Sequence, residues 1–251
     1  MRYAVFSDIH SNLEALTAVL DALASSRIDR YLCLGDVVGY GADPAACLER
    51  LRACQALVVG GNHDLACVGK LDVGWFNDAA RAAVLWTRDQ LSFTELDDLR
   101  RWPLQTTEGP ATLVHGTLTH PERFEYLVDV AQVVDTLSAC RTLFCLVGHT
   151  HLPCAIEYDR TQRRLMRILA TAAELADMAF ADEPARLRYL LNPGSVGQPR
   201  DGDPRASYAV IDTANHRLSV QRVAYDIVSA QRKIRQAGLP ELLAERLAVG
   251  R

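Results

Sequence analysis

The 251-residue sequence predicts an α/β protein built on parallel β-strands. Short apolar runs, which are typical of buried strands, alternate with segments whose apolar residues recur at helical spacing. At the start of the chain the order is strand, helix, strand, helix, strand, which implies parallel strands joined by right-handed crossovers. Five of the apolar runs end in short polar blocks of Asp, Asn, His and Gly, as do the ligand-binding edges of open α/β sheets.

The N-terminal part supplies three strands and two helices. The apolar runs predict strands at Tyr3–Ser7, Tyr31–Leu34 and Ala56–Val59. Ser11-Asn12-Leu13-Glu14 has the form of a capping box, and leucines follow it at helical spacing. Asp43-Pro44 combines an N-cap residue with proline at the first helical position, which predicts a helix to about Arg52.

The next segment, a helical excursion from the strand–helix alternation, contains two consecutive helices and no strand. The sequence predicts helices at Asp78–Leu91 and Ser92–Arg101, the second opened by a capping box from Ser92 to Glu95. Trp102-Pro103 ends it. We interpret the excursion as a cap over the site, and we expect one domain over residues 1–251 with a helical cap insertion at about 75–102.

The rest of the chain returns to strands. Two strands with a helix between them are predicted at Ala111–Val114, Val130–Ala139 and Leu143–Val147. A hairpin is expected from Ala155–Tyr158 and roughly Leu165–Leu169, followed by a helix over Leu169–Phe180. The last predicted elements are a strand at Arg188–Leu191, a glycine-rich turn from Asn192 to Gly197, a hairpin from Tyr208–Asp212 and Leu218–Val223, and helices at Asp226–Gln236 and Pro240–Leu247.

Composition excludes several classes of protein. The net charge of −4 argues against nucleic-acid binding through bulk charge. The seven cysteines are odd in number and form no C-x-x-C pair, which is typical of free cytoplasmic thiols. The N-terminal apolar run is too short for a signal-peptide core, and no stretch approaches a membrane span. We therefore expect a soluble cytoplasmic protein, whose oligomeric state the sequence does not predict.

The early polar blocks carry residues that bind hard-to-borderline metals. Asp8 and His10 alternate at the end of the first strand, so both side chains can face one side. Asp36 follows the second strand, and its two oxygens can bridge two cations. Asn62 follows the third strand and offers a neutral carbonyl oxygen.

The later blocks carry histidines. His115 ends the fourth strand, and His149 and His151 share one face after the fifth. The pair His149-x-His151 is a metal signal in itself, whereas each of the Asp8, Asp36 and Asn62 blocks alone is explained as well by ordinary capping or loop residues. Together the blocks would meet along one edge of the sheet. His120 and His216 fall in a loop and a predicted hairpin turn, and we assign them no role.

His63 is next to Asn62 in sequence and therefore projects differently. It is better placed as a proton donor or phosphate-contacting group than as a ligand to the same ion. Asp64 is positioned in the sequence to orient it.

As an ordered set, these motifs resemble the calcineurin-like metallophosphoesterases. The set is Asp8-x-His10, Gly35-Asp36, Gly61-Asn62-His63-Asp64, His115 and Gly148-His149-x-His151. Three stretches resemble a bacterial and archaeal branch of YfcE-like and diadenosine tetraphosphatase-related phosphodiesterases: Asp8–Asn12, Gly35–Gly41 and Asn192–Arg200. The resemblance spans Tyr3 to about Asp212, and the helical excursions match no motif of the family.

The resemblance implies a four-layer α/β/β/α sandwich with two divalent metal ions, manganese foremost and iron, zinc or nickel as alternatives. One ion would be held by Asp8, His10, Asp36 and His151, and the other by Asp36, Asn62, His115 and His149, with Asp36 as the bridge. His63, paired with Asp64, would be the general acid or a transition-state contact. Asn62, His63 and Arg200 would contact the phosphate.

This site predicts a dinuclear metal-dependent phosphoesterase, foremost a phosphodiesterase that acts on a small or nucleotide-like substrate. Two ions about 3.5–4 Å apart bind one water, lower its pKa and let the resulting hydroxide attack phosphorus. The sequence contains no nucleophilic-serine motif and no P-loop.

Three alternatives stay open at this point. A serine/threonine protein phosphatase would share the metal ligands and would have an extended groove over them. A non-catalytic scaffold would lack ligands, whereas every expected position is filled. A metal-dependent amidohydrolase would place its H-x-H pair early in a β/α barrel rather than after the fifth strand.

Overall fold

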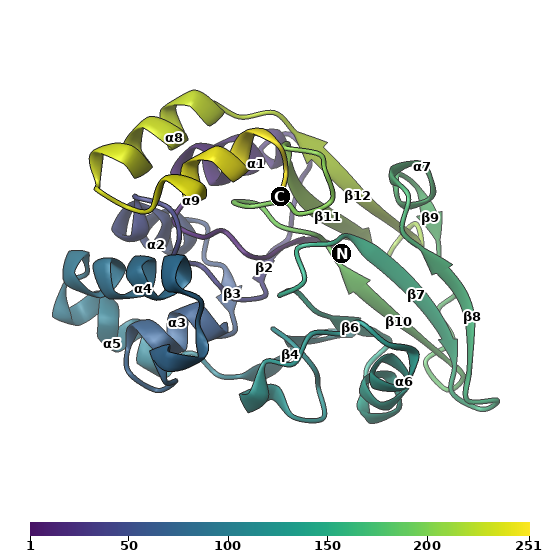
Figure 1. Ribbon diagram of the computed structural model, residues 1–251. Coiled ribbons are helices and arrows are strands. Elements are labelled where there is room, and N and C mark those ends of the chain that lie inside the picture. Colours follow the sequence, from purple (N-terminus) through teal and green to yellow (C-terminus); the bar gives the residue numbers. More distant parts are fainter.

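The computed structural model describes residues 1–251. Two β-sheets stack face to face and helices cover their outer faces, which gives four layers (Figure 1). This arrangement confirms the predicted α/β/β/α sandwich. None of the helices is both long enough and apolar enough to cross a bilayer.

The first sheet has six strands in the order β3 (Leu57–Val58), β2 (Arg30–Cys33), β1 (Arg2–Phe6), β11 (Ala206–Asp212), β12 (Arg217–Val223) and β9 (Met178–Ala179). The strands β1, β2 and β3 are parallel, as the alternation predicted, and β11 joins β1 in antiparallel register. Helices α1 (Leu13–Leu23) and α2 (Pro44–Ala53) cover the outer face, with Leu16 and Leu48 packed on Phe6 in one core cluster.

The second sheet also has six strands, in the order β4 (Gln105–Glu108), β5 (Ala111–Val114), β6 (Phe144–Leu146), β10 (Leu187–Asn192), β7 (Cys154–Asp159) and β8 (Arg164–Leu169). The central strands β5, β6 and β10 are parallel. Helix α6 (Val130–Ala139) covers the outer face, where Val133 and Leu137 are buried against Val114.

The main core lies between the sheets. Val5 and Leu34 from the first sheet are fully buried in the same cluster as Leu113, Leu146 and Leu191 from the second. Burying one such side chain contributes about 1.5–3 kcal/mol. Sandwich packing therefore holds together the ends of β1, β2, β5 and β6, where the polar blocks lie.

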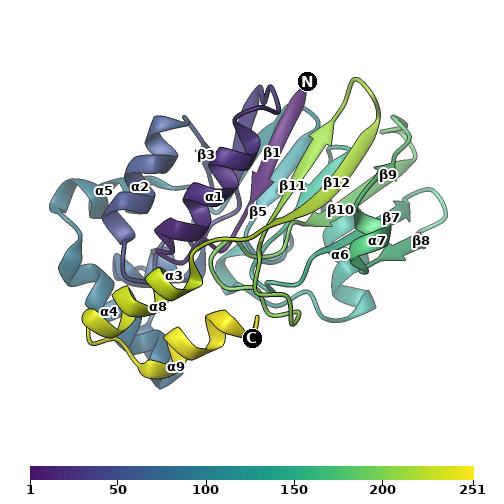
Figure 2. The ribbon, with the colours of Figure 1, turned by 90° about the horizontal axis from the view of Figure 1, so that it is seen from above.

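The remaining helical segments are α3 (Asn62–Cys67), η1 (Val73–Trp75), α4 (Asp78–Gln90), α5 (Phe93–Arg101), η2 (Pro121–Arg123), α7 (Ala172–Leu175), α8 (Ile227–Gln236), α9 (Glu241–Glu245) and η3 (Arg246–Ala248). Seen from above, α8 and α9 lie beside α4 at one end of the sandwich (Figure 2). Their contact is apolar, since Ala83 of α4 shares a buried cluster with Ile234 and Leu243.

Two predictions of secondary structure are wrong, and two elements were missed. Helix α1 is capped by Asn12, whose side-chain oxygen accepts the Ala15 N–H at 3.1 Å, and not by Ser11, whose φ is +52°. Helix α3 and strand β4 were not predicted. Most of Leu169–Phe180 is not helical: only α7 forms there, because the chain then pairs with β12 as β9 and buries Phe180 between the sheets.

The C-terminal helices are joined to the N-terminal ones by an ion cluster. Lys233 of α8 contacts Glu14 of α1 at 2.6 Å and Asp43, which precedes α2, at 2.8 Å. Asp43 makes no capping hydrogen bond to α2, because its carboxylate binds this lysine.

We expect Lys233→Met to lower the free energy of unfolding by about 1–2 kcal/mol, because it leaves two partly buried carboxylates without their cation. Urea denaturation of the metal-free protein measures this change. Lys70→Met is the matched control, since Lys70 is the only other lysine and its ammonium binds one exposed backbone carbonyl, that of Arg100. Equal destabilisation by the two changes would contradict the prediction.

Candidate metal centre

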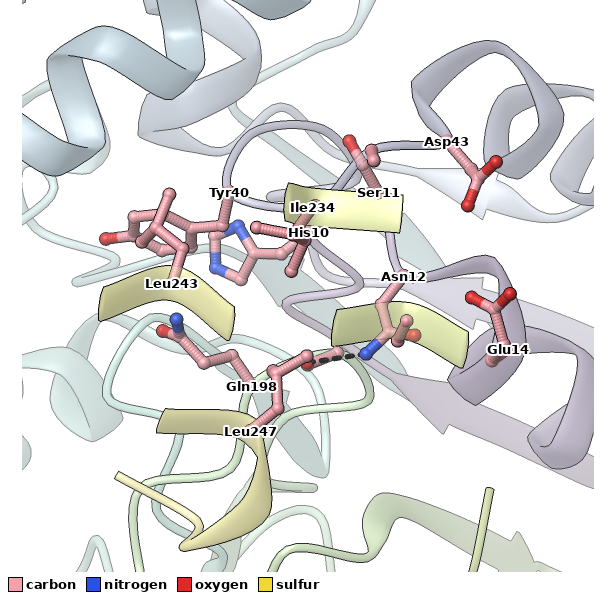
Figure 3. A pocket seen from close by; sticks show the side chains of 14 residues that line it. His10, Ser11, Asn12, Glu14, Tyr40, Asp43, Gln198, Ile234, Leu243 and Leu247 are labelled. Atoms are coloured by element: carbon pink, nitrogen blue, oxygen red, sulfur yellow. Dashed lines mark hydrogen bonds between the residues drawn. The ribbon is translucent and has the colours of Figure 1, made fainter. Parts of the chain in front are cut away.

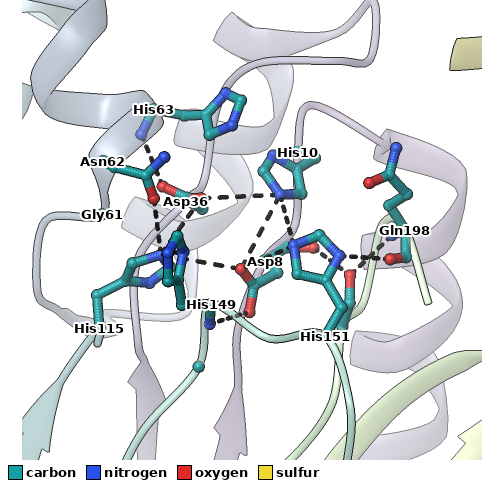
Figure 4. A network of polar contacts seen from close by, with 12 residues as sticks. Asp8, His10, Asp36, Gly61, Asn62, His63, His115, His149, His151 and Gln198 are labelled. Carbon is teal, nitrogen blue, oxygen red and sulfur yellow. Dashed lines mark hydrogen bonds and ion pairs between the residues drawn. The ribbon is translucent and has the colours of Figure 1, made fainter. Parts of the chain in front are cut away.

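The polar blocks meet at one edge of the sandwich. Asp8 follows β1, Asp36 follows β2, Asn62 begins α3 just past β3, His115 follows β5 and His149 follows β6 (Figure 4). Because these strands run in parallel within each sheet, their carboxyl ends lie together. The two aspartates and the four histidines assigned as ligands are all buried: Asp8, His10, Asp36, His115, His149 and His151.

Most of the predicted ligands at this edge share the same kind of backbone strain. Five of the predicted ligands have a φ between 50° and 67°, in the left-handed region: Asp8, His10, Asp36, His149 and His151. Each such residue costs on the order of 1 kcal/mol or more, and such residues cluster at functional sites. Hydrogen bonds between loops support the conformation, including Asp8 N–H to Gly35 O and His10 N–H to Asp36 O, both at 3.0 Å.

The structure brings the seven predicted ligands together in two groups. In the first group, His151 Nε2 lies 3.2 Å from both Asp8 Oδ1 and His10 Nε2. In the second, His115 Nε2 lies 3.3 Å from Asp36 Oδ2, 3.1 Å from His149 Nδ1 and 3.2 Å from Asn62 Oδ1. Asp36 Oδ2 is also 3.8 Å from His10 Nε2, so Asp36 lies between the groups.

The donor atoms fit divalent cations. The Nδ1 atoms of three histidines face backbone carbonyls: His10 that of Val38, His115 that of Leu34, and His151 that of Gln198. If each Nδ1 donates its proton there, the Nε2 lone pairs point into the groups, which is the arrangement that orients metal-bound histidines. Lone pairs 3.2 Å apart repel without a cation between them, and Asp8 Oδ1 is buried with no hydrogen-bond partner.

Burial and mutual charge set the protonation of these groups. Burial alone would raise the pKa of Asp8 and Asp36, but their histidine neighbours lower both below the ordinary range. Burial lowers the pKa of His149 to about 3. Burial would also lower the pKa of His115, but Asp36 and Asp8 raise it to about 9. At neutral pH His115 is therefore the ligand that must lose a proton before it binds a metal.

We expect metal affinity to increase with pH for this reason. Below pH 9 a metal ion competes with the His115 proton, so affinity should rise by up to about tenfold per pH unit from pH 6.5 to 8.5. Calorimetric titration of the metal-free protein with Mn²⁺, in buffers of different ionisation heat, should show about one proton released at pH 7. A pH-independent affinity without proton release would contradict this assignment.

His63 lies beside the two groups rather than inside the second one. It is on the first turn of α3, its backbone N–H donates to Asp36 Oδ1 at 2.9 Å, and its ring is 4.8 Å from that of His10. Its Nδ1 is buried without a hydrogen-bond partner. Burial lowers the pKa of His63 to about 4, so the ring is neutral at pH 7 in the metal-free protein. Gly39, with a φ of +88°, makes room for it, because a Cβ there would lie 2.5 Å from His63 Nδ1.

The predicted pairing of His63 with Asp64 is wrong. Asp64 Oδ1 accepts the backbone N–H groups of Val37 and Val38 at 3.0 and 3.1 Å, and Asp64 Oδ2 accepts that of Gly61 at 2.9 Å. Since helix α3 starts at Asn62, Asp64 is its third residue and turns back to cap the helix and hold the Asp36 loop. Asp64 is a positioning residue for the loops that carry the ligands.

A cleft of ≈ 800 Å³ opens above the two groups. One wall comes from the predicted cap, but only from the segment that includes Trp75, Phe76 and Ala80; helix α5 instead buries Leu99 in the core of the first sheet. The opposite wall comes from residues 122–126, where the Tyr126 ring stacks on His149 with centroids 4.0 Å apart. This wall was not predicted, and the one signal for it in the sequence is the pair of aromatic residues in an otherwise polar loop.

The comparisons with known proteins agree with this geometry. The calcineurin-like phosphoesterase superfamily domain matches residues 1–216. The chain belongs to this superfamily. Its membership supports a metal-dependent phosphoester hydrolase, as predicted from the ordered motifs, and the two stacked sheets exclude the β/α barrel of the amidohydrolase alternative.

Three relatives illustrate how far the similarity extends. An uncharacterized protein of Methanocaldococcus jannaschii, MJ0912, is 40% identical over 252 residues, covering 99% of this chain and 98% of the relative. A metallophosphoesterase from Sphaerobacter thermophilus is 40% identical with a TM-score of 0.84, covering 100% of this chain and 99% of that one. The hypothetical protein PH1004 from Pyrococcus horikoshii shares the fold, at 20% identity and a TM-score of 0.77, covering 100% and 98% of the two chains.

Proposed function

We propose that this protein is a dinuclear phosphodiesterase that hydrolyses a small or nucleotide-like phosphate ester. The observation that carries the proposal is the pair of ligand groups that share Asp36 as a common neighbour. The proposed first site consists of Asp8, His10, Asp36 and His151, and the proposed second site consists of Asp36, Asn62, His115 and His149. Manganese is the metal we propose first, with iron, zinc or nickel as alternatives.

Two bound divalent ions would supply positive charge to the phosphoryl oxygens and an activated water as nucleophile. The side chains of the protein would orient the substrate. Asn62, at the first turn of α3, presents a neutral amide oxygen beside His115 without adding charge. His63 borders the cleft, so its ring is placed to donate a hydrogen bond to the leaving oxygen or, when the ring carries a second proton, to transfer that proton to it.

The shape of the cleft supports a small substrate over a folded protein. Its volume falls within the range of about 300–1,000 Å³ that is usual for small-molecule sites. Aromatic residues line both walls, among them Phe76 and Tyr126. A serine/threonine protein phosphatase is the alternative function within the superfamily. We propose a cytoplasmic location, which the seven free cysteines support.

The proposal is tested by hydrolysis of bis-p-nitrophenyl phosphate, p-nitrophenyl phosphate and a phosphoserine peptide by protein loaded in turn with each of the four metals. We expect the diester to have the highest kcat/KM, with activity removed by EDTA and restored by Mn²⁺. Preference for the peptide would favour the protein phosphatase. No hydrolysis of any ester by metal-loaded protein would overturn the enzymatic proposal.

A further inference from the structure

Five aromatic side chains line the cleft above the ligand groups: Tyr40, Trp75, Phe76, Phe124 and Tyr126. Three of them have their rings packed against other parts of the protein. Tyr40 is buried and also borders a small pocket with Leu243 and Leu247 of the C-terminal helices (Figure 3). Phe76 packs on the core with its ring centroid 4.9 Å from that of His63, and Phe124 is buried with its ring centroid 6.0 Å from that of His115. These three rings build the cleft, which leaves Trp75 and Tyr126 available to a ligand.

Trp75 lines the cleft without packing on the core. Its side chain is 83% exposed, the largest value among the large apolar residues, and it belongs to none of the hydrophobic clusters. The backbone beneath it is nevertheless fixed. Trp75 ends η1, whose cap Asp72 accepts the Gly74 N–H at 2.8 Å, and the next residue, Phe76, anchors the segment in the core. An exposed indole on a fixed segment, facing a cleft with other aromatic rings, is typical of a ligand-binding site.

Tyr126 is held beside the second ligand group with one ring face open. Its ring stacks on that of His149, with centroids 4.0 Å apart and an interplanar angle of 18°, and its side chain is still 45% exposed. Because stacking covers one face of the ring, the exposed part is the other face and the edge. The loop that carries Tyr126 rests on Gly116, where a Cβ would lie 3.0 Å from the backbone oxygen of Glu125. The open face of Tyr126 is therefore fixed next to the proposed metal site.

The charge of the lining favours an uncharged group away from the metals. The Asp, Glu, Lys and Arg residues that line the cleft are Glu122, Arg123 and Glu125, one cation against two carboxylates. Arg200, for which the family resemblance implied a phosphate contact, does not line the cleft, and its Nη2 donates to Gln198 Oε1 at 3.2 Å. Outside the ligand groups the cleft thus has no excess of positive charge for a further phosphate, whereas its open aromatic faces suit a planar ring.

We propose that Trp75 and Tyr126 form a stacking subsite for a nucleobase of the substrate, beside the phosphate that is hydrolysed. This inference rests on the proposed phosphodiesterase function, and it narrows the substrate to phosphodiesters of nucleosides. Every nucleobase has a π-face, so stacking accepts any base. Trp75 and Tyr126 are then specificity-determining residues that select a base over a sugar or an alkyl group.

The first test needs no catalysis. Adenosine, which carries no phosphate, is titrated into protein loaded with Mn²⁺; calorimetry gives Kd, and tryptophan emission reports stacking on Trp75. We expect saturable binding that quenches the emission. Trp75→Leu and Tyr126→Leu should each raise Kd at least about fivefold, the lower end of the loss caused by removing a ring that stacks on a base. Trp75→Phe should lose the quenching and keep most of the affinity.

A matched variant and a second probe make this test specific. Phe93→Leu is the control, because Phe93 at the start of α5 is 80% exposed but does not line the cleft, and its Kd should equal that of the wild type. Cyclohexanol is an aliphatic ring that cannot stack. Absence of adenosine binding by the wild type, equal Kd values for the wild type and both leucine variants, or equal Kd values for cyclohexanol and adenosine would overturn the stacking subsite.

The second test compares two diesters with the same leaving group. They are the p-nitrophenyl ester of thymidine 5′-phosphate and methyl p-nitrophenyl phosphate, which has no base. We expect a higher kcat/KM for the thymidine ester, and the ratio of the two values should fall at least about fivefold in Trp75→Leu and Tyr126→Leu but not in Phe93→Leu. An unchanged ratio in both leucine variants would contradict the subsite. If neither ester is hydrolysed, the phosphodiesterase proposal fails, while the adenosine titration still decides whether the two rings bind a base.

Discussion

Asp36→Asn should reduce hydrolysis of bis-p-nitrophenyl phosphate by about 10³-fold or more. Asp36 lies between the two groups, with Oδ2 at 3.3 Å from His115 Nε2 and 3.8 Å from His10 Nε2, whereas Asp8 Oδ1 approaches His115 Nε2 only to 4.0 Å. An amide in its place has no negative charge and one oxygen instead of two. Metal charge contributes several kcal/mol to the transition state, and each 1.4 kcal/mol or so corresponds to a factor of about ten in rate.

Metal content and turnover should therefore fall together in this variant. Elemental analysis of the purified protein gives the first quantity and the diester assay gives the second. Asp159→Asn is the matched control, because this aspartate pairs with Arg186 at 2.8 Å at the end of β7 and lies outside the ligand groups. Removing Asp36 should also lower the pKa of His115 from about 9, since Asp36 is the main cause of its elevation. An Asp36→Asn protein that keeps two metals and full activity would refute the bridging assignment.

His63→Asn should lower kcat by about 10²–10⁴-fold while the metal content stays unchanged, which is the range for loss of one acid–base group. The loss should be greater for a diester with an alkyl leaving group than for one that releases p-nitrophenolate. An alkoxide needs a proton as it leaves, whereas p-nitrophenolate is stable without one. Comparing kcat for the two esters therefore distinguishes proton donation from a merely structural role.

Measuring the metal content of the His63→Asn protein distinguishes proton donation by His63 from metal binding by His63. A ring nitrogen of His63 also lies within 4.8 Å of donor atoms of His10 and Asp36, so a metal-binding role has a definite geometric basis. If His63→Asn lost one metal equivalent, His63 would be a ligand and the proton-donor assignment would fail. His120→Asn is the control, because His120 is exposed in a loop and contacts only Glu122.

Much of this protein could be predicted from local sequence patterns. The parallel arrangement of β1, β2 and β3 followed from strands alternating with helices, and the hairpins β7–β8 and β11–β12 from paired apolar runs. Polar blocks at strand ends identified the residues that gather at one edge of the sandwich, because the ends of parallel strands in a sheet lie together. These features depend on residues close in sequence and on a general rule of sheet geometry.

Other features depended on contacts that no local pattern encodes. Asp64 looked like a partner for His63 because the two are adjacent, but α3 begins at Asn62, so the carboxylate turns back onto the Asp36 loop. Leu169–Phe180 has helical spacing, yet pairing with β12 and burial of Phe180 between the sheets outweigh that weak preference.

The sequence by itself determined the fold class and the set of ligand-type residues at the strand ends. Only the tertiary structure decided what surrounds them: the left-handed backbone at five of those residues, the Tyr126 wall over His149 and the exposed Trp75 on the opposite wall of the cleft. The physical reason is the distance along the chain over which each kind of interaction acts. Hydrophobic spacing and helix caps act within a few residues, whereas a cleft wall or a strained loop is held by packing and hydrogen bonds between segments far apart in the chain.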